Sequence, residues 1–316
     1  MLLPLLLAMQ LASPDSMSVY NGRRNELSVR IPRLEADVVI DGSLDELAWS
    51  RAGMLTGFSQ FSPSDGLPAV DSTEVLVWYS PSSIYFGIRA FEQHGQVHAT
   101  LADRDRIFAD DNIQILLSTF NDGRQATVFM VNPLGVQADG SLVETGQAGQ
   151  TGIFGGGAVS RDPTNLNPDY VFQSKGRITE YGYEVEVRIP FKSLRYQSAG
   201  EQTWGFNVVR QIQHSGYEDS WAPARQSSAS FLAQSGKLTG LTEIHRGLVL
   251  DLQPELTARV DGAPQLNGWD YQRRDPQVGG NVRWGITNNL TLNGTANPDF
   301  AQIESDAGQV TFDPRQ

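Results

Sequence analysis

One alternating stretch decides the fold class of this chain: residues 182–190 read GYEVEVRIP. Apolar and polar side chains alternate there with period two, as Tyr183, Val185, Val187 and Ile189 against Glu184, Glu186 and Arg188. This alternation is typical of an antiparallel strand with one buried and one solvated face, and Pro190 ends it. The stretch therefore predicts a sheet with one solvent-exposed face.

Similar short runs lie on both sides of this strand, which we place at Tyr181–Ile189. They are rich in β-branched and aromatic residues and are separated by Gly, Pro, Asn and Asp: Val75–Tyr79, Ser83–Phe91, Asn112–Ser118, Ala126–Val131, Tyr170–Ser174 and Trp204–Ile212. Two segments, Gly146–Gly157 and Asp162–Pro168, are predicted loops. Because helical periodicity is almost absent, the spacing predicts an all-β antiparallel β-sandwich.

One helical turn is expected, at Leu44–Ala52, with Ser43 as its N-cap in a capping box. We expect Trp49 on this turn to pack beneath the sandwich as a core residue. Asp41, just before the turn, is expected to accept hydrogen bonds from nearby backbone. These residues are therefore interpreted as structural.

Composition excludes several classes of protein. The chain has 316 residues and a formal net charge of −12, and this negative field would repel phosphate backbones. It has no cysteine, so disulfides, thiolate zinc sites and cysteine nucleophiles are excluded. The length allows one large or two ordinary domains, and we expect no nucleic-acid partner.

The first 16 residues are expected to form a secretory signal. Leu2–Ala12 is an apolar run broken only by Pro4 and Gln10, too short to span a membrane as a helix and of the length of a signal h-region. The alternative is a buried N-terminal segment. The first interpretation predicts export to the periplasm, the outer membrane or the cell surface.

After Gly247 the pattern changes. Leu248, Leu250 and Leu252 begin a long alternating strand, and residues 281–296 predict a hairpin with its turn at Thr287–Asn289. Transmembrane β-strands need about 9–11 residues with one apolar and one polar face, which this segment provides. An ordinary soluble hairpin is the alternative. Since the smallest single-chain barrels have about eight strands, the barrel interpretation predicts that residues 247–316 hold only the first strands of an incomplete barrel.

A family resemblance rests on several segments. Residues 39–49, VIDGSLDELAW, closely resemble the opening signature of family 9 carbohydrate-binding modules and their DOMON-like relatives. Residues 131–140, VNPLGVQADG, and 189–196, IPFKSLRY, resemble a family in which such a module precedes an outer-membrane-type β-barrel. Residues 284–292, WGITNNLTL, and 297–306, NPDFAQIESD, are similar to the start of that barrel. The resemblance implies a sandwich at residues 27–245 and a role in carbohydrate binding or catabolism.

Candidate ligand-binding residues follow from how proteins hold sugars, with exposed aromatic faces beside polar side chains. Trp221 and Tyr217 lie in a loop-like segment, 217–225, that also holds acidic residues and an arginine, so we expect Trp221 to be an exposed platform. Trp78 and Tyr79 end one strand, and Arg89 lies on the next at a spacing compatible with cross-strand neighbours. Ordinary packing within the sheet is the alternative for these three.

An acidic cluster is the candidate metal site. Asp103, Asp105, Asp110 and Asp111 fall close together before a predicted strand, and Asp139 follows on the next hairpin. Calcium takes about six to eight oxygen ligands, which such a loop offers. The resemblance to family 9 modules, which carry structural calcium, implies a calcium site here as well. The alternative is that the carboxylates pair with nearby arginines or cap backbone groups.

Motifs of catalysis are missing from the sequence. The four histidines show no H-E-x-x-H spacing, and neither a G-x-S-x-G elbow nor a P-loop is present. We therefore expect a non-catalytic module that binds a carbohydrate or related polar ligand at the cell envelope. The alternatives are a hydrolase acting on glycosidic bonds, and a structural or plug domain of a transport barrel.

Overall fold

The computed structural model describes residues 17–36, 38–92, 96–144, 164–197, 200–245, 247, 249–265, 268–273, 275–286 and 290–297. The expected signal at residues 1–16 and the expected loop Gly146–Gly157 lie outside these ranges. Within them, no helix is long and apolar enough to cross a membrane.

The first of two large sheets contains the stretch that decided the fold class. Its strands, in spatial order, are β1 (Val19–Asn21), β3 (Gly53–Thr56), β5 (Thr73–Tyr79), β6 (Ser83–Phe91), β11 (Gly182–Pro190) and β10 (Gln173–Thr179). All neighbours are antiparallel except the pair β1 and β3. The sheet thus begins before residue 27, where we had expected the sandwich to start.

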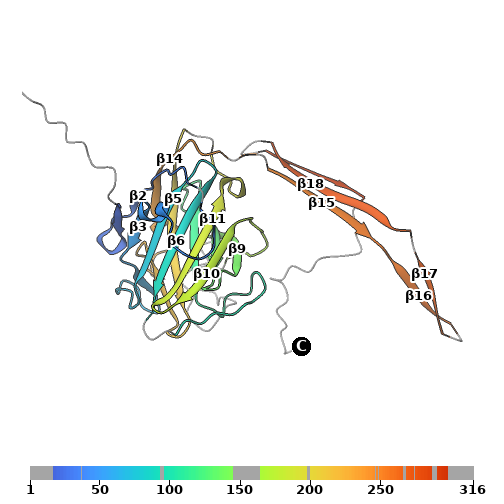
Figure 1. Cartoon of the computed structure of the whole chain (residues 1–316), viewed down its shortest axis with the longest axis horizontal. Coiled ribbons are helices and arrows are strands. Elements are labelled where there is room, and N and C mark those ends of the chain that lie inside the picture. The colour runs from blue at the N-terminus through green and yellow to red at the C-terminus, as the bar shows by residue number, and fades with distance from the viewer. Residues whose placement is uncertain are drawn as a thin grey trace, which may run out of the picture.

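The second sheet faces the first. Its strands, in spatial order, are β2 (Ser28–Arg30), β14 (Gly236–Thr242), β12 (Glu201–Ile212), β7 (Asn112–Ser118), β8 (Gln125–Val131) and β9 (Gln137–Val143). Beside this path, β13 (Tyr217–Ser220) pairs with both β12 and β4 (Ser59–Ser62). Figure 1 shows the two layers as one body, and the all-β sandwich expected from the sequence is confirmed.

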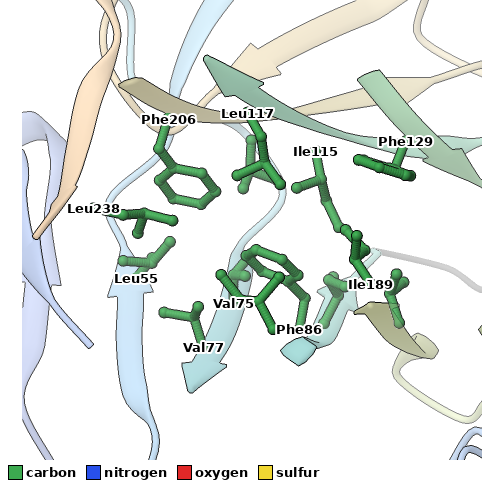
Figure 2. Packing of buried hydrophobic residues seen from close by; sticks show 14 of the residues in the cluster. Leu55, Val75, Val77, Phe86, Ile115, Leu117, Phe129, Ile189, Phe206 and Leu238 are labelled. Atoms are coloured by element: carbon green, nitrogen blue, oxygen red, sulfur yellow. The ribbon is translucent and has the colours of Figure 1, made fainter. Parts of the chain in front are cut away.

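The main core fills the space between the two sheets. Figure 2 shows Val75, Val77 and Phe86 of the first sheet facing Ile115 and Phe206 of the second. The Phe86 and Phe206 rings stack with their centroids 5.8 Å apart. Full burial of each such side chain stabilises the fold by about 1.5–3 kcal/mol. These residues come from strands far apart in the chain, so they bind the two sheets into one unit.

A second cluster covers the outer face of the first sheet. Helix α1 (Leu47–Ser50) places Trp49 over Gly87 of β6, with the indole 1% exposed, as expected for a core residue. A Cβ atom added to Gly87 would lie 2.9 Å from Cζ3 of Trp49. The helix is shorter than expected and begins after Glu46, because the Ser43 backbone N–H donates to Asp41 Oδ1 (2.9 Å) and forms a turn there.

Residues after 247 form a separate arm. β15 (Val249–Thr257), β18 (Gln277–Gly285) and β19 (Thr291–Ala296) make a three-stranded antiparallel sheet. β16 (Val260–Gln265) and β17 (Gly268–Arg273) make a two-stranded continuation. Figure 1 shows the arm reaching away from the sandwich to the tip at β16 and β17. The expected pairing across residues 281–296 is confirmed, and its turn at 287–289 lies outside the described residues.

Candidate functional site

Trp221, the expected sugar platform, is a core residue. Its side chain is 0% exposed, its ring lies 5.7 Å from that of Phe206, and its Nε1 donates to Tyr20 O at 3.4 Å. The sequence predicts a loop here, but residues Tyr217–Ser220 form β13, which pairs with β12. Asp219 and Trp221 therefore both point inwards. The expectation of an exposed platform was wrong.

Trp78 and Tyr79 are also unavailable to a ligand, contrary to expectation. Trp78 is 0% exposed and stacks on Tyr85 with centroids 3.9 Å apart, beneath Trp49. Tyr79 is 2% exposed and faces the core, where its hydroxyl donates to Gly240 O at 3.0 Å. Ordinary packing, the alternative interpretation, describes both residues.

Arg89 lies in a charged ladder across the outer face of the first sheet. The register places Glu74, Arg89, Glu184 and Arg177 side by side on four strands, so Arg89 is not beside Trp78. Arg89 Nε lies 3.4 Å from Glu184, and Arg177 Nη2 lies 2.6 Å from it. Burial opposes ionisation of Glu184, but hydrogen bonds from Tyr181 and Arg177 outweigh it and lower its pKa. Tyr217, half-buried on β13, lies on the other sheet.

The aspartates of the acidic cluster bind backbone and side-chain donors of the protein itself. Asp110 accepts from Thr100 N (3.1 Å) and Asn132 Nδ2 (2.8 Å). Asp111 accepts from His98 N and Gln213 N, each at 2.7 Å. The two carboxylates thus fix the loop before β7 to neighbouring segments.

The remaining aspartates diverge from this pair. Asp139 binds the Arg104 guanidinium and Tyr170 N (2.5 Å), and burial raises its pKa to about 6. Asp105 Oδ1 accepts from Asp139 N (3.3 Å), whereas Asp103 is exposed. Across the described residues, no group of three or more His, Cys, Asp or Glu side chains could hold a metal ion. The aspartates thus cap backbone groups and pair with Arg104, as the alternative interpretation of the acidic cluster expected.

The signature at residues 39–49 is held by one buried carboxylate. Glu186 Oε2 accepts from Asp41 N (2.8 Å) and Gly42 N (2.7 Å), and Oε1 accepts from Trp49 Nε1 (3.1 Å). Burial and the nearby Glu46 carboxylate raise the pKa of Glu186 to about 7. These contacts hold the segment against the sheet, so the signature has a structural role in this chain.

A groove that the sequence did not reveal lies at the turn between β7 and β8. Its volume is about 1320 Å³. Residues of β7, β8 and β9 and of two loops, 167–171 and 192–195, form one wall, and β15, β18 and β19 line the other. Two aromatic side chains stand in the sandwich wall: Phe120, which is 38% exposed, and the half-buried Tyr170. Their polar neighbours in this wall include Gln125, Asn167, Asp169, Lys192 and Arg195.

Local structure explains this wall. Positive φ angles at Asn121 (50°) and Gly123 (64°) make the tight turn that leaves Phe120 at the surface. Thr119 donates to Arg195 O, and Ser193 Oγ donates to Val171 O at 2.6 Å, so the wall is fixed to neighbouring loops. The sequence signal that could have indicated this wall is Phe120, an aromatic residue beside the turn-forming residues 121–123.

No protein-family model and no curated protein matches the chain. Two similar solved structures are of a family 9 carbohydrate-binding module from Caldicellulosiruptor kristjanssonii, one with cellotriose and one with glucose. Each has 13% sequence identity to this chain, a TM-score of 0.45 and an alignment that covers 67% of this chain. The alignments cover 92% of the module chain with cellotriose and 94% of the module chain with glucose. A third is a candidate carbohydrate-binding protein from Bacteroides uniformis, with 15% identity, TM-score 0.49, and 67% of this chain and 98% of that chain covered. All three TM-scores are below 0.5, so the fold assignment rests on the strands themselves.

Proposed function

We propose that the sandwich binds a carbohydrate in the groove beside the β7–β8 turn. The observation that carries this proposal is the wall itself, where exposed Phe120 and half-buried Tyr170 stand among amide and charged side chains. Aromatic faces pack on the C–H surfaces of sugars while polar side chains bind the hydroxyls. The sandwich wall alone carries this proposal, because the other wall belongs to the arm, whose residues Leu250, Leu252 and Val282 are proposed below to face lipid.

Binding is favoured over hydrolysis by the carboxylates of this wall. Glycosidases use two carboxyl groups, one on each side of the scissile bond. Two carboxylates line the groove among the described residues: Asp169 in the sandwich wall and Asp251 in the arm wall, where Asp251 lies opposite Arg283 in the strand register. The sandwich wall that holds Phe120 and Tyr170 therefore supplies one carboxylate, and hydrolysis needs two. We therefore propose a non-catalytic module.

A pair of matched variants tests the groove. Phe120 and Tyr181 are both 38% exposed, but Tyr181 lies on the other sheet, beside Glu184. A glycan array on the full chain selects an oligosaccharide, and titration calorimetry measures its affinity. Phe120→Ala should weaken binding at least tenfold, and Tyr181→Ala should change it less than twofold. Equal affinity for the Phe120→Ala variant and the wild type would refute the proposed site.

We further propose that the arm attaches the protein to an outer membrane as barrel strands. One face of the arm is apolar, because Leu250, Leu252 and Leu256 pair with Trp284, Val282 and Val278. Exposure of these side chains ranges from 43% for Trp284 to 73% for Leu256. The opposite face carries pairs such as Asp251 with Arg283 and Gln253 with Asn281. A barrel strand needs this division between lipid and lumen.

The dimensions of the arm support the same proposal. β15 and its partner β18 each span nine residues, about 30 Å along a strand, which a tilt of about 40° reduces to about 23 Å. That is about the height of the apolar band of an outer-membrane barrel. Trp284 lies near one end of this span, and exposed Trp269 and Tyr271 lie beyond the other, as expected of two aromatic girdles.

Two adjacent residues of β18 provide the test. Trp284 faces the apolar side, and Arg283 faces the polar side. The full chain should float with phosphatidylethanolamine and phosphatidylglycerol vesicles in a density gradient. Trp284→Asp should lower the vesicle-bound fraction several-fold, and Arg283→Asp should leave it nearly unchanged. A wild-type chain that stays at the bottom of the gradient would contradict membrane attachment.

A further inference from the structure

Arg210 bridges the two sheets at one end of the core. It lies on β12 of the second sheet, and its side chain is 0% exposed. Its Nη1 atom lies 3.2 Å from Ser72 O, 3.2 Å from Thr73 Oγ1 and 2.9 Å from Phe91 O, all in or beside the first sheet. The two N–H groups of Nη1 thus serve three acceptors and join the sheets where the hydrophobic core ends.

Acidic groups outnumber basic ones around this guanidinium. Three carboxylates interact with it: Glu92 after β6, Asp111 before β7 and Asp219 on β13. Two further carboxylates, Asp71 before β5 and Glu218 on β13, are charged neighbours of Asp219. The Tyr183 ring of β11 lies 5.5 Å from its Cζ atom. The second basic group is His214, 30% exposed after β12, whose Nδ1 lies 2.8 Å from Glu92 Oε1. Uncompensated buried carboxylates are costly in their charged form.

Asp219 has the least compensated carboxylate of this group. It lies opposite Arg210 in the register of β12 and β13 and is 0% exposed. Among the described residues, neither of its carboxylate oxygens has a hydrogen-bond partner. A buried acceptor in this state is stabilised by taking up a proton or by opening to water.

A recess lies beside this cluster. It has a volume of about 180 Å³ and is lined by Asp71, Ser72 and Thr73, among others. Ser72 and Thr73 are also the residues that accept from Arg210. Separation of the sheets at Arg210 would therefore join the recess to the buried carboxylates.

We propose that this end of the sandwich is a proton-linked clamp, in which Asp219 takes up a proton to close the sheets around Arg210 and releases it when they open to water. The clamp is distinct from the groove and does not depend on carbohydrate binding. Protonation of Asp219 reduces the surplus of negative charge around Arg210. The closed form is thus favoured by acid, and the open form by alkali.

The sign and size of the effect follow from the environment of Asp219. Burial raises the pKa of its carboxyl group to about 6, whereas the same group in water titrates near about 3.9. The closed form therefore binds more protons between these values, and its stability falls as the pH rises through about 6. For this single group the closing equilibrium is about tenfold more favourable at pH 5 than at pH 8.

Hydrogen exchange on the full chain measures the clamp. Peptides covering residues 88–92 and 208–221 should gain about tenfold in protection factor from pH 8 to pH 5, after correction for the intrinsic exchange rate. Asp219→Asn should keep most of that protection at pH 8, because its side chain is neutral at every pH.

A carboxylate that does not line the recess provides the control. The Glu35 side chain is 71% exposed and pairs with Arg33, so Glu35→Gln should keep the wild-type pH dependence. Protection at 208–221 that is equal at pH 5 and pH 8 would overturn the proposal. So would a pH dependence in the Asp219→Asn variant as large as that of the wild type.

Discussion

Replacing Trp221 with alanine separates a core residue from a ligand platform. The indole is 0% exposed and contacts the Phe206 ring, and the backbone of Gly236 lies against it, since a Cβ atom there would come within 2.6 Å of Trp221 Cζ3. A buried aromatic side chain removes about 150–250 Å² from water. At about 25 cal/mol per Å² this is worth about 4–6 kcal/mol, in line with the about 3–5 kcal/mol measured for Phe or Trp to Ala changes in cores.

The assay is urea unfolding of the full chain, followed by circular dichroism so that the loss of an indole does not disturb the signal. Trp221→Ala should lower the free energy of unfolding of the sandwich by about 3–5 kcal/mol. Trp269→Ala, at a side chain 63% exposed on the arm, should change it by less than about 0.5 kcal/mol. A loss below about 1 kcal/mol for Trp221→Ala would refute the packing described here and restore the ligand-platform hypothesis.

Three further changes test other parts of the fold. Gly87→Ala forces a methyl group to 2.9 Å from Trp49 and should cost about 1–3 kcal/mol, and thermal melting at no less than the wild-type temperature would contradict this. Because burial raises the pKa of Glu186 to about 7, its contribution to stability is present at acidic pH and is lost as the pH rises from about 4.5 to 7; Glu186→Gln should flatten this dependence, and an unchanged slope would count against it. Since Asp111 is bonded to backbone N–H groups, excess calcium and excess chelator should give the same melting temperature, and a calcium-dependent rise would reinstate the metal site.

Strand prediction succeeded where alternation and turn residues agree. β6 and β7 have the bounds expected from the sequence, and β11 differs by one residue at each end. It failed where polar residues are buried. β9 contains Asp139 and Gly140, two residue types that are rare in strands. The Asp139 carboxylate is compensated by the Arg104 guanidinium. Gly140 is needed because Asn165 O lies too close to its backbone for any side chain. The strand expected at Tyr170–Ser174 is shifted, because β10 begins only at Gln173.

The candidate site was the least predictable part. Trp221 has polar neighbours in sequence, but the pairing of β13 with β12 turns it inwards, and no local pattern shows that a strand resumes there. Phe120 lies beside a turn and is exposed, yet the groove around it needs residues from 167–171 and 192–195. Such a wall depends on long-range contacts, which the order of residues along the chain does not encode locally.

A crystal structure of the full chain with the array-selected oligosaccharide tests the central claim most directly. The account predicts a sugar ring in the groove, with its C–H face within about 4 Å of Phe120 and its hydroxyls bonded to side chains such as Asn167 and Arg195. A sugar bound on any other surface of the sandwich, with the groove unoccupied, would contradict it.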